Sequence, residues 1–222
     1  MKIKALIPVR SGSVRVANKN IRPFAGSNLL EIKIKQLLTV KELDGIVVNS
    51  NSDEIHKKAS KYPVQLVKRE EKFATNSASP NDCYENMAQN LHADAIIHIT
   101  VTHPLLLPKT VSTIINKFKK GKYDSVVAVY PVKKFLFHEG KSMNYDSEKI
   151  PRSQDLPNIV AVSWAASIIS KDLMLKRKSV VGANPFLYEL TETEAVDIDT
   201  PFDFTVAEVL YQKLFLSNFF GL

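Results

Sequence analysis

Two aspartates toward the end of the sequence, Asp197 and Asp199, are separated by a single residue. On an extended segment alternate side chains point to the same face, so both carboxylates can approach one cation. Mg²⁺ commonly takes one or two protein carboxylates and completes its octahedral shell with water and phosphate oxygens. The spacing therefore predicts a magnesium site at this pair. The alternative is a turn and helix cap at Asp199, Thr200 and Pro201. In either case we expect Asp203 in the first helical turn, near the positive end of the helix.

A loop rich in cationic and small residues follows the first apolar run, residues 3–9. Three of the six arginines in the chain, Arg10, Arg15 and Arg22, lie in or beside this loop. Cationic side chains form charge-assisted hydrogen bonds with phosphate oxygens, and backbone N–H groups of a Ser-Gly-Ser turn can approach the same oxygens. The loop therefore predicts a phosphate site, and a solvated basic turn is the alternative. The candidate ligands are Arg10, Ser11, Gly12, Ser13, Arg15 and Lys19.

The overall charge is less informative than this loop. Thirty basic and 23 acidic side chains leave a net charge of +7, which can signal a nucleic-acid partner. The lysines, however, are spread over the whole chain as on a solvated surface, so we expect no nucleic-acid partner. The loop matches neither the P-loop pattern nor the GxGxxG fingerprint, which disfavours a P-loop ATPase and a dinucleotide dehydrogenase.

The elements that must position these residues follow from hydrophobic periodicity, which predicts strands alternating with helices. Such an order needs crossover connections and indicates an α/β fold with a doubly wound, mostly parallel sheet. Its ligand crevice lies at the carboxyl ends of the strands, where the phosphate loop begins. We expect strands at 3–9, 45–49, 64–67, 95–100, 124–132 and 159–169, short strand-like pieces within 182–199, and helices at 29–40, 52–61, 81–92, 108–120 and 200–216.

Residues 133–157 interrupt this alternation. They are polar and irregular, and the segment is too long for a hairpin loop. We therefore expect a functional or interface insertion in which Phe135, Leu136 and Phe137 are exposed. The alternative is a loop whose aromatic side chains pack on its own sheet.

Length and composition indicate one globular domain over residues 1–222. Apolar residues make up 45% and charged residues 24% of the chain, as is usual for globular proteins. No apolar stretch reaches the roughly 18 residues needed to cross a bilayer, so we expect no membrane partner. The absence of a leader pattern and the single cysteine favour a cytoplasmic location. We expect Cys83 to be a buried helix residue, and the five histidines show no metal-ligand spacing.

Four segments, in order along the chain, resemble the acylneuraminate cytidylyltransferase (CMP-N-acetylneuraminic acid synthetase) family. The first is IPVRSGSVRVANKNI at residues 7–21, and the second is Arg69 with FATNSAS at 73–79. The third is RSQDLP at 152–157, and the fourth is VDIDTPFDF at 196–204. The resemblance spans nearly the whole chain, and its first and last motifs are the more specific ones.

This resemblance implies a Rossmann-like nucleotidyltransferase that makes a CMP-sugar from CTP and an acidic sugar and releases pyrophosphate. It also implies Mg²⁺ as cofactor and a homodimer formed through the insertion, in which Arg152 or Gln154 could approach the partner's sugar pocket. The catalytic residues would be Arg10, Lys19, Asp197 and Asp199, the last two holding the metal. The nucleotide site would comprise Arg10, Ser11, Gly12, Ser13, Lys19, Asn20, Arg69, Ser79 and Thr100, and the sugar site Thr102, Arg152, Gln154 and Ser163.

The chain departs from the family pattern at several of these positions. Thr100 stands where the family commonly has a glutamine near the base, and a hydroxyl cannot replace both the donor and the acceptor of an amide. Asn51 and Asn76 stand where aspartates are usual. On the sugar side the family's arginine, asparagine and glycine are replaced by Ala161, Ser163 and Trp164.

These departures predict a smaller, less basic and more aromatic acceptor pocket that uses N-acetylneuraminic acid poorly. Arg152 or Lys141, from this chain or a partner, could replace the missing clamp on the sugar carboxylate. Three alternatives stay open. They are a nucleotidyltransferase using another base or a non-acidic sugar, a glycosyltransferase whose Asp197-Ile198-Asp199 is a DxD motif, and a non-catalytic nucleotide-binding relative.

Overall fold

The structure is a computed structural model that describes residues 1–13 and 15–216. Its strands are β1 (Ile3–Pro8), β2 (Gly45–Ser50), β3 (Gln65–Lys68), β4 (Ala95–Ile99), β5 (Ser125–Pro131), β6 (Phe137–His138), β7 (Lys141–Ser142), β8 (Val160–Ser170) and β9 (Pro185–Glu189). Its α-helices are α1 (Leu29–Leu38), α2 (Asp53–Ala59), α3 (Pro80–Gln89), α4 (Pro108–Lys119), α5 (Lys171–Arg177) and α6 (Pro201–Tyr211). Short 3₁₀ turns lie at Glu71–Phe73 and Ser153–Asp155, and a π-helical turn at Gln212–Leu216 follows α6.

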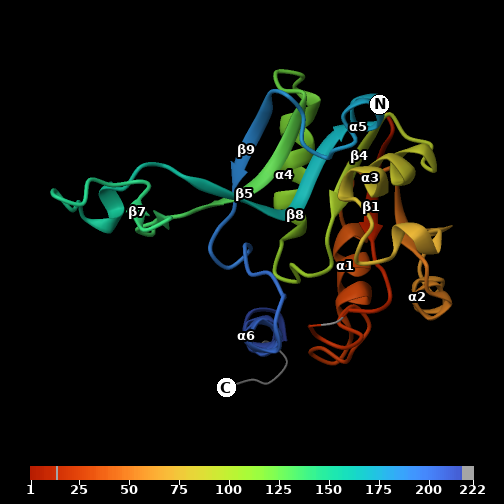
Figure 1. The fold of residues 1–222 in the computed structure, drawn as a ribbon. Coiled ribbons are helices and arrows are strands. Elements are labelled where there is room, and N and C mark those ends of the chain that lie inside the picture. The colour runs from red at the N-terminus through yellow and green to blue at the C-terminus, as the bar shows by residue number, and fades with distance from the viewer. Residues whose placement is uncertain (14, 217–222) are drawn as a thin grey trace.

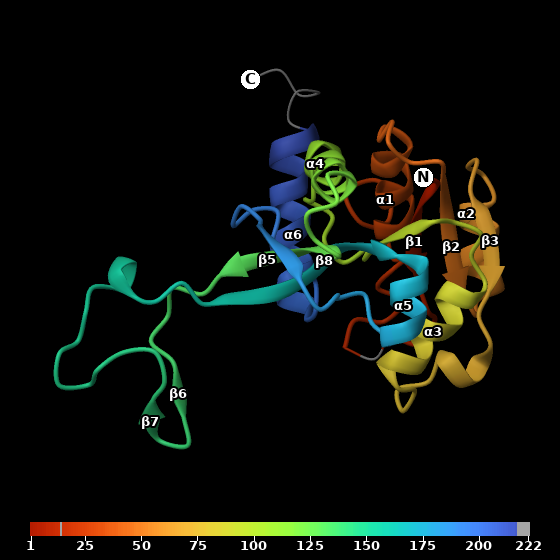
Figure 2. The same ribbon diagram turned by 90° about the horizontal axis from the view of Figure 1, so that it is seen from above.

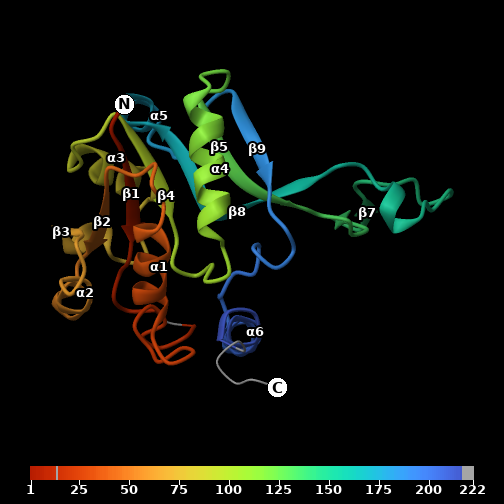
Figure 3. The ribbon, with the colours of Figure 1, turned by 180° about the vertical axis from the view of Figure 1, so that it is seen from behind.

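Seven strands form one sheet in the order β3-β2-β1-β4-β8-β5-β9. Strand β8 runs antiparallel to both of its neighbours, and every other pair in this sheet is parallel. Helices α1 and α4 cover one face and α3 and α5 cover the other, as the opposite views of Figures 1 and 3 show. The expected doubly wound, mostly parallel sheet is confirmed.

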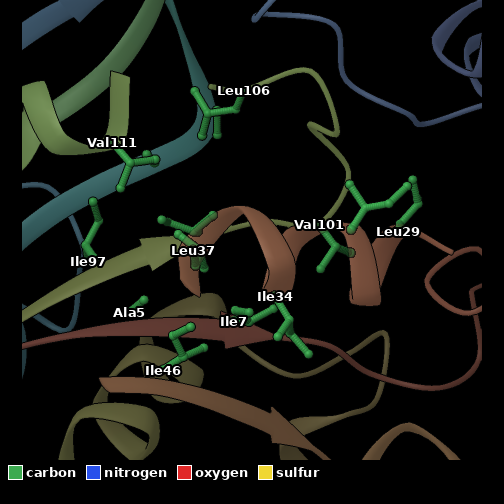
Figure 4. Close-up of a cluster of buried hydrophobic side chains, with 14 of the residues drawn as sticks. Ala5, Ile7, Leu29, Ile34, Leu37, Ile46, Ile97, Val101, Leu106 and Val111 are labelled. Atoms are coloured by element: carbon green, nitrogen blue, oxygen red, sulfur yellow. The ribbon is translucent and has the colours of Figure 1, made fainter. Parts of the chain in front are cut away.

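Strands that are covered on both faces are buried along their whole length, which explains the continuous apolar runs in the sequence. In β1, Ile3, Ala5 and Ile7 belong to the cluster that packs against α1, α2 and α4, while Leu6 belongs to the cluster under α3 and α5. Figure 4 shows Ala5 and Ile7 with their partners in the first cluster. Alternate side chains thus fix the strand between two layers of helices.

Side-chain caps set the starts of several helices, two of them beside the site. Asn28 accepts a hydrogen bond from Glu31 N at 3.0 Å and begins α1 just after the cationic loop. At the start of α6, the Thr200 hydroxyl accepts from Asp203 N, and the Asp203 carboxylate accepts from Thr200 N at 2.7 Å. This capping box confirms the expected position of Asp203. Ser170 caps α5, a short helix that the sequence pattern did not predict.

Residues 132–159 leave the sheet between β5 and β8 and form an arm that projects away from the rest of the molecule (Figure 2). The arm contains the short β6–β7 hairpin. Phe135 and Phe137 pack edge-on against Tyr145 of the same arm, yet the Phe137 side chain remains 62% exposed. Leu136 is only half-exposed. The alternative, in which these aromatic side chains pack on the chain's own sheet, is therefore wrong.

Candidate active site

The cationic loop leaves β1 at the carboxyl edge of the sheet and is fastened to the neighbouring strand. Val9 N donates to Asn49 O at 2.9 Å, where β2 nears its end. Ser11 N donates to Asn51 Oδ1 at 3.1 Å, and Asn51 Nδ2 donates back to Ser11 Oγ at 3.0 Å. Asn51, which replaces the aspartate usual in the family, therefore anchors the loop through a neutral amide.

Arg10 connects the loop to the segment that precedes α3. Its guanidinium donates to Ala74 O at 2.9 Å and to Asn76 Oδ1 at 2.7 Å, and Asn20 Nδ2 donates to Arg10 O at 3.0 Å. Beside these contacts lies a hollow of about 450 Å³. Its lining comprises Pro8, Arg10, Ser13, Arg15, Val16, Lys19, Asn20 and Asn76. The cationic and amide groups expected to bind phosphate thus meet at one place.

Lys19 links this hollow to the carboxylate pair. Its ammonium donates to the backbone carbonyl of Ile198 and lies 3.6 Å from Asp199 Oδ1. Arg15 contacts the same carboxylate oxygen at 2.9 Å. Two cations of the N-terminal loop therefore hold Asp199 at the edge of the hollow.

Asp197 and Asp199 line one cleft, while Ile198 between them is fully buried. The Ile198 amide donates to Thr102 O at 3.0 Å, which fixes the extended segment beside the end of β4. Burial raises the pKa of the Asp197 carboxyl above its ordinary value, and the nearby Thr102 hydroxyl opposes the rise. Asp197 Oδ1 is buried with no hydrogen-bond partner among the described residues.

This donor set fits a hard divalent cation. Two carboxylates on one face supply oxygen ligands, and the unpartnered Asp197 oxygen lacks the partner that a cation would provide. Over residues 1–13 and 15–216, no cluster of three or more His, Cys, Asp or Glu side chains could hold a metal. Any remaining ligands at this pair would therefore be other oxygen atoms, such as those of water or phosphate. Metal binding by Asp197 and Asp199 stays a prediction.

His103 is a residue of this site that the histidine spacing did not reveal. Its side chain is buried, with Nδ1 2.9 Å from Thr100 Oγ1 and 3.6 Å from Asp197 Oδ1. Burial, with the nearby charges of Lys33 and Lys19, lowers the pKa of His103 to about 3, so the ring is neutral at physiological pH. The available signal was position, because His103 follows the carboxyl end of a parallel strand.

A buried lysine supports the loop that carries His103. Lys33 of α1 is fully buried, and its ammonium donates to His103 O at 2.9 Å. Burial lowers the pKa of Lys33 to about 7, and the nearby carboxylate of Glu194 partly offsets the fall. Glu194 in turn accepts hydrogen bonds from Thr110 Oγ1 at 2.5 Å and Thr191 Oγ1 at 3.0 Å. Hydrogen bonds of Lys33 and Glu194 thus support the loops beside the cleft.

The cleft beside Asp197 and Asp199 has a volume of about 780 Å³. It adjoins the cationic hollow, because Asp199 lines the cleft and contacts Arg15 and Lys19 of the hollow. The further lining residues are His103, Tyr130, Pro131, Lys133, Lys134, Val162, Ser163, Trp164, Leu190, Glu192, Ala195, Val196 and Asp203. The expected aromatic character is present at Tyr130 and Trp164.

The expected loss of basic character is offset by residues that the sequence interpretation overlooked. Lys133 and Lys134, at the root of the arm, line the cleft, whereas Arg152 and Lys141 do not. Lys133 donates to Leu156 O at 2.9 Å. Arg152 is exposed and forms an ion pair with Asp155, with Nε 2.7 Å from Oδ2. Lys134 therefore replaces the two predicted clamp residues as the candidate within this chain.

The remaining predicted nucleotide residues fall into different environments. Arg69 is buried and bonds Asn49 through Nε, 2.6 Å from Oδ1, so its described hydrogen bonds go to protein groups. Ser79 is exposed and immediately precedes α3. Ser11, Gly12 and Ser13 lie together in the loop beside Arg10 and Asn20. Nucleotide contact by these residues stays a prediction.

The residues predicted to contact the base and the sugar also lie in different parts of the structure. Thr100 Oγ1 donates to Trp164 O at 3.3 Å and contacts His103, so its hydroxyl supports the cleft wall. Thr102 lies beside Asp197, and buried Ser163 lines the cleft while bonding Ala128 O at 3.2 Å. Gln154 is exposed on the arm with Arg152, away from the chain's own cleft.

Cys83 lies on α3 as expected, but it is only half-buried. Its thiol contacts Phe73 O at 3.3 Å, and burial raises the pKa of the Cys83 thiol above its ordinary value. Neither feature suits a nucleophile. In the part of the chain that the structure describes, no helix is both long and apolar enough to cross a membrane.

A family model described as cytidylyltransferase matches residues 4–218 of the chain. The chain is 28% identical over 229 residues to an N-acylneuraminate cytidylyltransferase from Oncorhynchus mykiss, covering 99% of this chain and 52% of that protein. It is 27% identical to a pseudaminic acid cytidylyltransferase from Campylobacter jejuni, covering 96% of this chain and 97% of that protein. The chain thus spans about half the length of the first of these relatives and nearly all of the second.

Solved structures share the fold. One is a CMP:2-keto-3-deoxy-manno-octonic acid synthetase complexed with CTP, with a TM-score of 0.72 and 14% identity over 96% of this chain and 100% of the other. Another is a 4-diphosphocytidyl-2C-methyl-D-erythritol synthase from Anaerococcus prevotii, with a TM-score of 0.69 and 15% identity over 95% and 96% of the two chains. Both likenesses concern the fold alone.

Proposed function

This chain belongs to the cytidylyltransferase family, and from that premise we propose that it makes a CMP-sugar from CTP and an acidic nonulosonic-type sugar. The observation that carries the proposal is the junction at Asp199, where the cationic hollow meets the cleft of about 780 Å³. A triphosphate in the hollow would direct its α-phosphate toward an acceptor in the cleft. The names of the relatives support CTP as donor and a nonulosonic acid as acceptor.

In the proposed reaction a hydroxyl oxygen of the sugar attacks the α-phosphorus of CTP. The bond from that phosphorus to the bridging oxygen of the β-phosphate breaks, pyrophosphate leaves, and the hydroxyl gives its proton to solvent water. Arg10, Lys19 and the backbone donors of the loop would bind the triphosphate and offset its charge. The loop and the carboxylate segment would hold the two reactants in line, so positioning supplies much of the rate.

Asp197 and Asp199 would hold Mg²⁺ in this proposal. The ion would supply positive charge to the phosphate oxygens and polarise them as a Lewis acid. The buried, unpartnered oxygen of Asp197 supports this assignment. His103 and Thr102 would orient the Asp197 carboxylate, because both lie against it.

We also propose that two copies of the chain associate through the arm. Support comes from its apolar side chains, since Phe137, Met143 and Ile150 are exposed on a segment that stands clear of the body. Arg152 and Gln154 are on the same arm, and a two-fold pair would carry them toward the partner's cleft. Their predicted role in sugar binding depends on this assembly.

The test is release of pyrophosphate by the purified chain with CTP, Mg²⁺ and a panel of acceptors. The panel holds pseudaminic acid, N,N'-diacetyllegionaminic acid, N-acetylneuraminic acid, 3-deoxy-manno-octulosonic acid (Kdo) and a neutral hexose, with mass spectrometry of the CMP-sugar. We expect turnover with at least one nonulosonic acid and poor use of N-acetylneuraminic acid. Parallel reactions with UTP, GTP and ATP test the base, since Thr100 replaces the family's glutamine.

The alternatives give different products in this assay. A glycosyltransferase would consume a nucleotide-sugar and release a nucleoside mono- or diphosphate, and a non-catalytic relative would bind CTP without turnover. Pyrophosphate release that fails with every acceptor, although calorimetry shows CTP binding, would support the non-catalytic relative. Turnover with the neutral hexose alone would overturn the acidic acceptor.

A further inference from the structure

The backbone of β8 is left-handed at Trp164, where φ is 60°. Residues other than glycine rarely adopt this conformation, and a large aromatic side chain there is an outlier. The register of β8 against β5 shifts between Val127 and Val129, so Trp164 lies in a β-bulge. The family that the sequence resembles commonly has glycine at this position. The chain therefore carries an indole where the backbone conformation favours glycine.

Neighbouring groups hold this conformation from both sides. Thr100 Oγ1 donates to Trp164 O at 3.3 Å, and Thr100 N donates to Ala165 O at 3.3 Å. The Ser163 hydroxyl donates to Ala128 O and accepts from Ala165 N, each at 3.2 Å. Strained backbone persists where its surroundings fix it in this way, and it gathers at functional sites.

Trp164 lines the cleft and is not part of the core. The residue is 43% exposed, although the next two residues, Ala165 and Ala166, are fully buried. Within the described residues the indole nitrogen has no hydrogen-bond partner, and the ring makes no ring-to-ring or cation contact. Packing within the protein therefore does not account for a tryptophan at a strained position.

The chemistry of the surrounding cleft indicates what the indole would contact. Tyr130, which pairs with Ala161 in the adjacent strand, also lines the cleft and is 39% exposed. Val162 and Leu190 add apolar surface, while Lys134, Asp197 and Asp199 supply charges elsewhere on the lining. An acceptor that fits such a site is charged at one end and presents methyl or acyl groups to the aromatic wall.

We propose that Trp164 is a specificity-determining residue that selects acidic sugars bearing N-acyl and terminal methyl groups over those bearing a polyhydroxyl tail. Pseudaminic acid has such a methyl-terminated side chain, whereas N-acetylneuraminic acid ends in hydroxyl groups that would lose water against the indole without gaining a partner. The inference rests on the proposed function. It adds that the acceptor pocket recognises the apolar groups of the sugar.

The decisive variant is Trp164→Gly, because glycine suits the observed φ and should leave the fold intact. We expect a melting temperature equal to or above that of the wild type and a CTP affinity within twofold. The ratio of kcat/KM for pseudaminic acid to that for N-acetylneuraminic acid should fall by about tenfold, the range expected when an apolar contact is lost from a pocket. Trp164→Phe, which keeps an aromatic ring, should retain part of the preference.

A second readout does not depend on turnover. Trp164 is the single tryptophan of the chain, so emission excited at 295 nm reports on the cleft alone. Pseudaminic acid should shift this emission to the blue by removing water from the indole, and N-acetylneuraminic acid should shift it less. That shift would support the inference even if no pyrophosphate were released, which separates its failure from that of the proposed function.

Two results would overturn the inference. One is a pseudaminic acid to N-acetylneuraminic acid ratio that stays within twofold of wild type in Trp164→Gly. The other is a loss of melting temperature and CTP affinity in that variant to the same degree as the loss of sugar turnover, which would assign Trp164 a structural role.

Discussion

The ammonium of Lys19 connects the N-terminal cationic loop to the carboxylate segment near the end of the chain. It donates to the carbonyl of Ile198, 179 positions away, and lies 3.6 Å from the Asp199 carboxylate. The contact makes the phosphate loop and the carboxylate segment one unit. A change on either side is therefore expected to alter both nucleotide binding and the position of the carboxylates.

Removing a loop cation should weaken CTP binding. Lys19→Ala and Arg10→Ala each remove a charge-assisted contact, which should cost on the order of 1.5 to 3 kcal/mol in binding free energy measured by calorimetry. Lys120→Ala, beyond the end of α4 at the opposite edge of the sheet, is the matched control and should bind CTP normally. Unchanged CTP affinity in both loop variants would rule out the loop as the phosphate site.

The three aspartates of the final motif should separate into two roles. Asp197→Asn and Asp199→Asn should reduce kcat strongly and raise the Mg²⁺ concentration needed for half-maximal rate, because an amide is a poor ligand for this ion. Asp203→Asn weakens the capping box of α6 and should lower stability by about 1 kcal/mol with the Mg²⁺ requirement unchanged. Equal Mg²⁺ requirements in all three variants would argue against the metal pair.

Lys134 should contribute to binding of the sugar carboxylate. Lys134→Ala should raise KM for the acidic sugar by about tenfold, corresponding to roughly 1.4 kcal/mol, with KM for CTP unchanged. Lys141→Ala, which alters the predicted clamp residue that does not line the cleft, is the comparison. A larger effect at Lys141 than at Lys134 would indicate that the clamp comes from a partner's arm.

The arm should control assembly. We expect the wild type to sediment as a dimer and Phe137→Ser combined with Ile150→Ser to shift it toward monomer, because both side chains are exposed on the arm. Phe202→Ser removes a similarly exposed aromatic from α6 and should leave the dimer intact. A wild type that sediments as a monomer at micromolar concentration would contradict the proposed association.

Acid should destabilise the fold through His98 of β4. The side chain is buried, and burial together with the charge of Arg69 lowers its pKa from 6.5 to about 4. Between pH 6.5 and about 4 the unfolded chain binds a proton that the folded chain does not. The free energy of unfolding should therefore decrease as the pH is lowered through this window. The contribution of this residue is at most about 1.4 kcal/mol per pH unit.

The measurement is chemical denaturation across this pH range with two variants. His98→Phe should show a smaller slope than wild type, because the titrating group is gone. His138→Gln, at an exposed histidine of the arm, should keep the wild-type slope. Identical slopes for wild type and His98→Phe would contradict the prediction.

The local sequence predicted most of the strands and helices, because the pattern of apolar residues within each segment indicates which of its side chains are buried. Ile3 to Val9 reads as a strand covered on both faces, and it is one up to Pro8. Helix α5 was not predicted, because its seven residues are too few to show a clear helical period of apolar residues after the Ser170 cap. The position of β8 in the sheet could not be predicted either. Its apolar run indicates a buried strand but does not indicate which strands it pairs with.

The sequence by itself determined the cationic loop and the spacing of Asp197 and Asp199, because each is a short motif contained within a few neighbouring residues. Only the tertiary structure decided that Lys19 meets Asp199, that neutral His103 lies beside Asp197, and that Lys134 and Trp164 line the cleft. Those relationships arise from strand order and from a bulge in β8. Contacts between distant segments depend on how the layers pack, and no local pattern of residues encodes them.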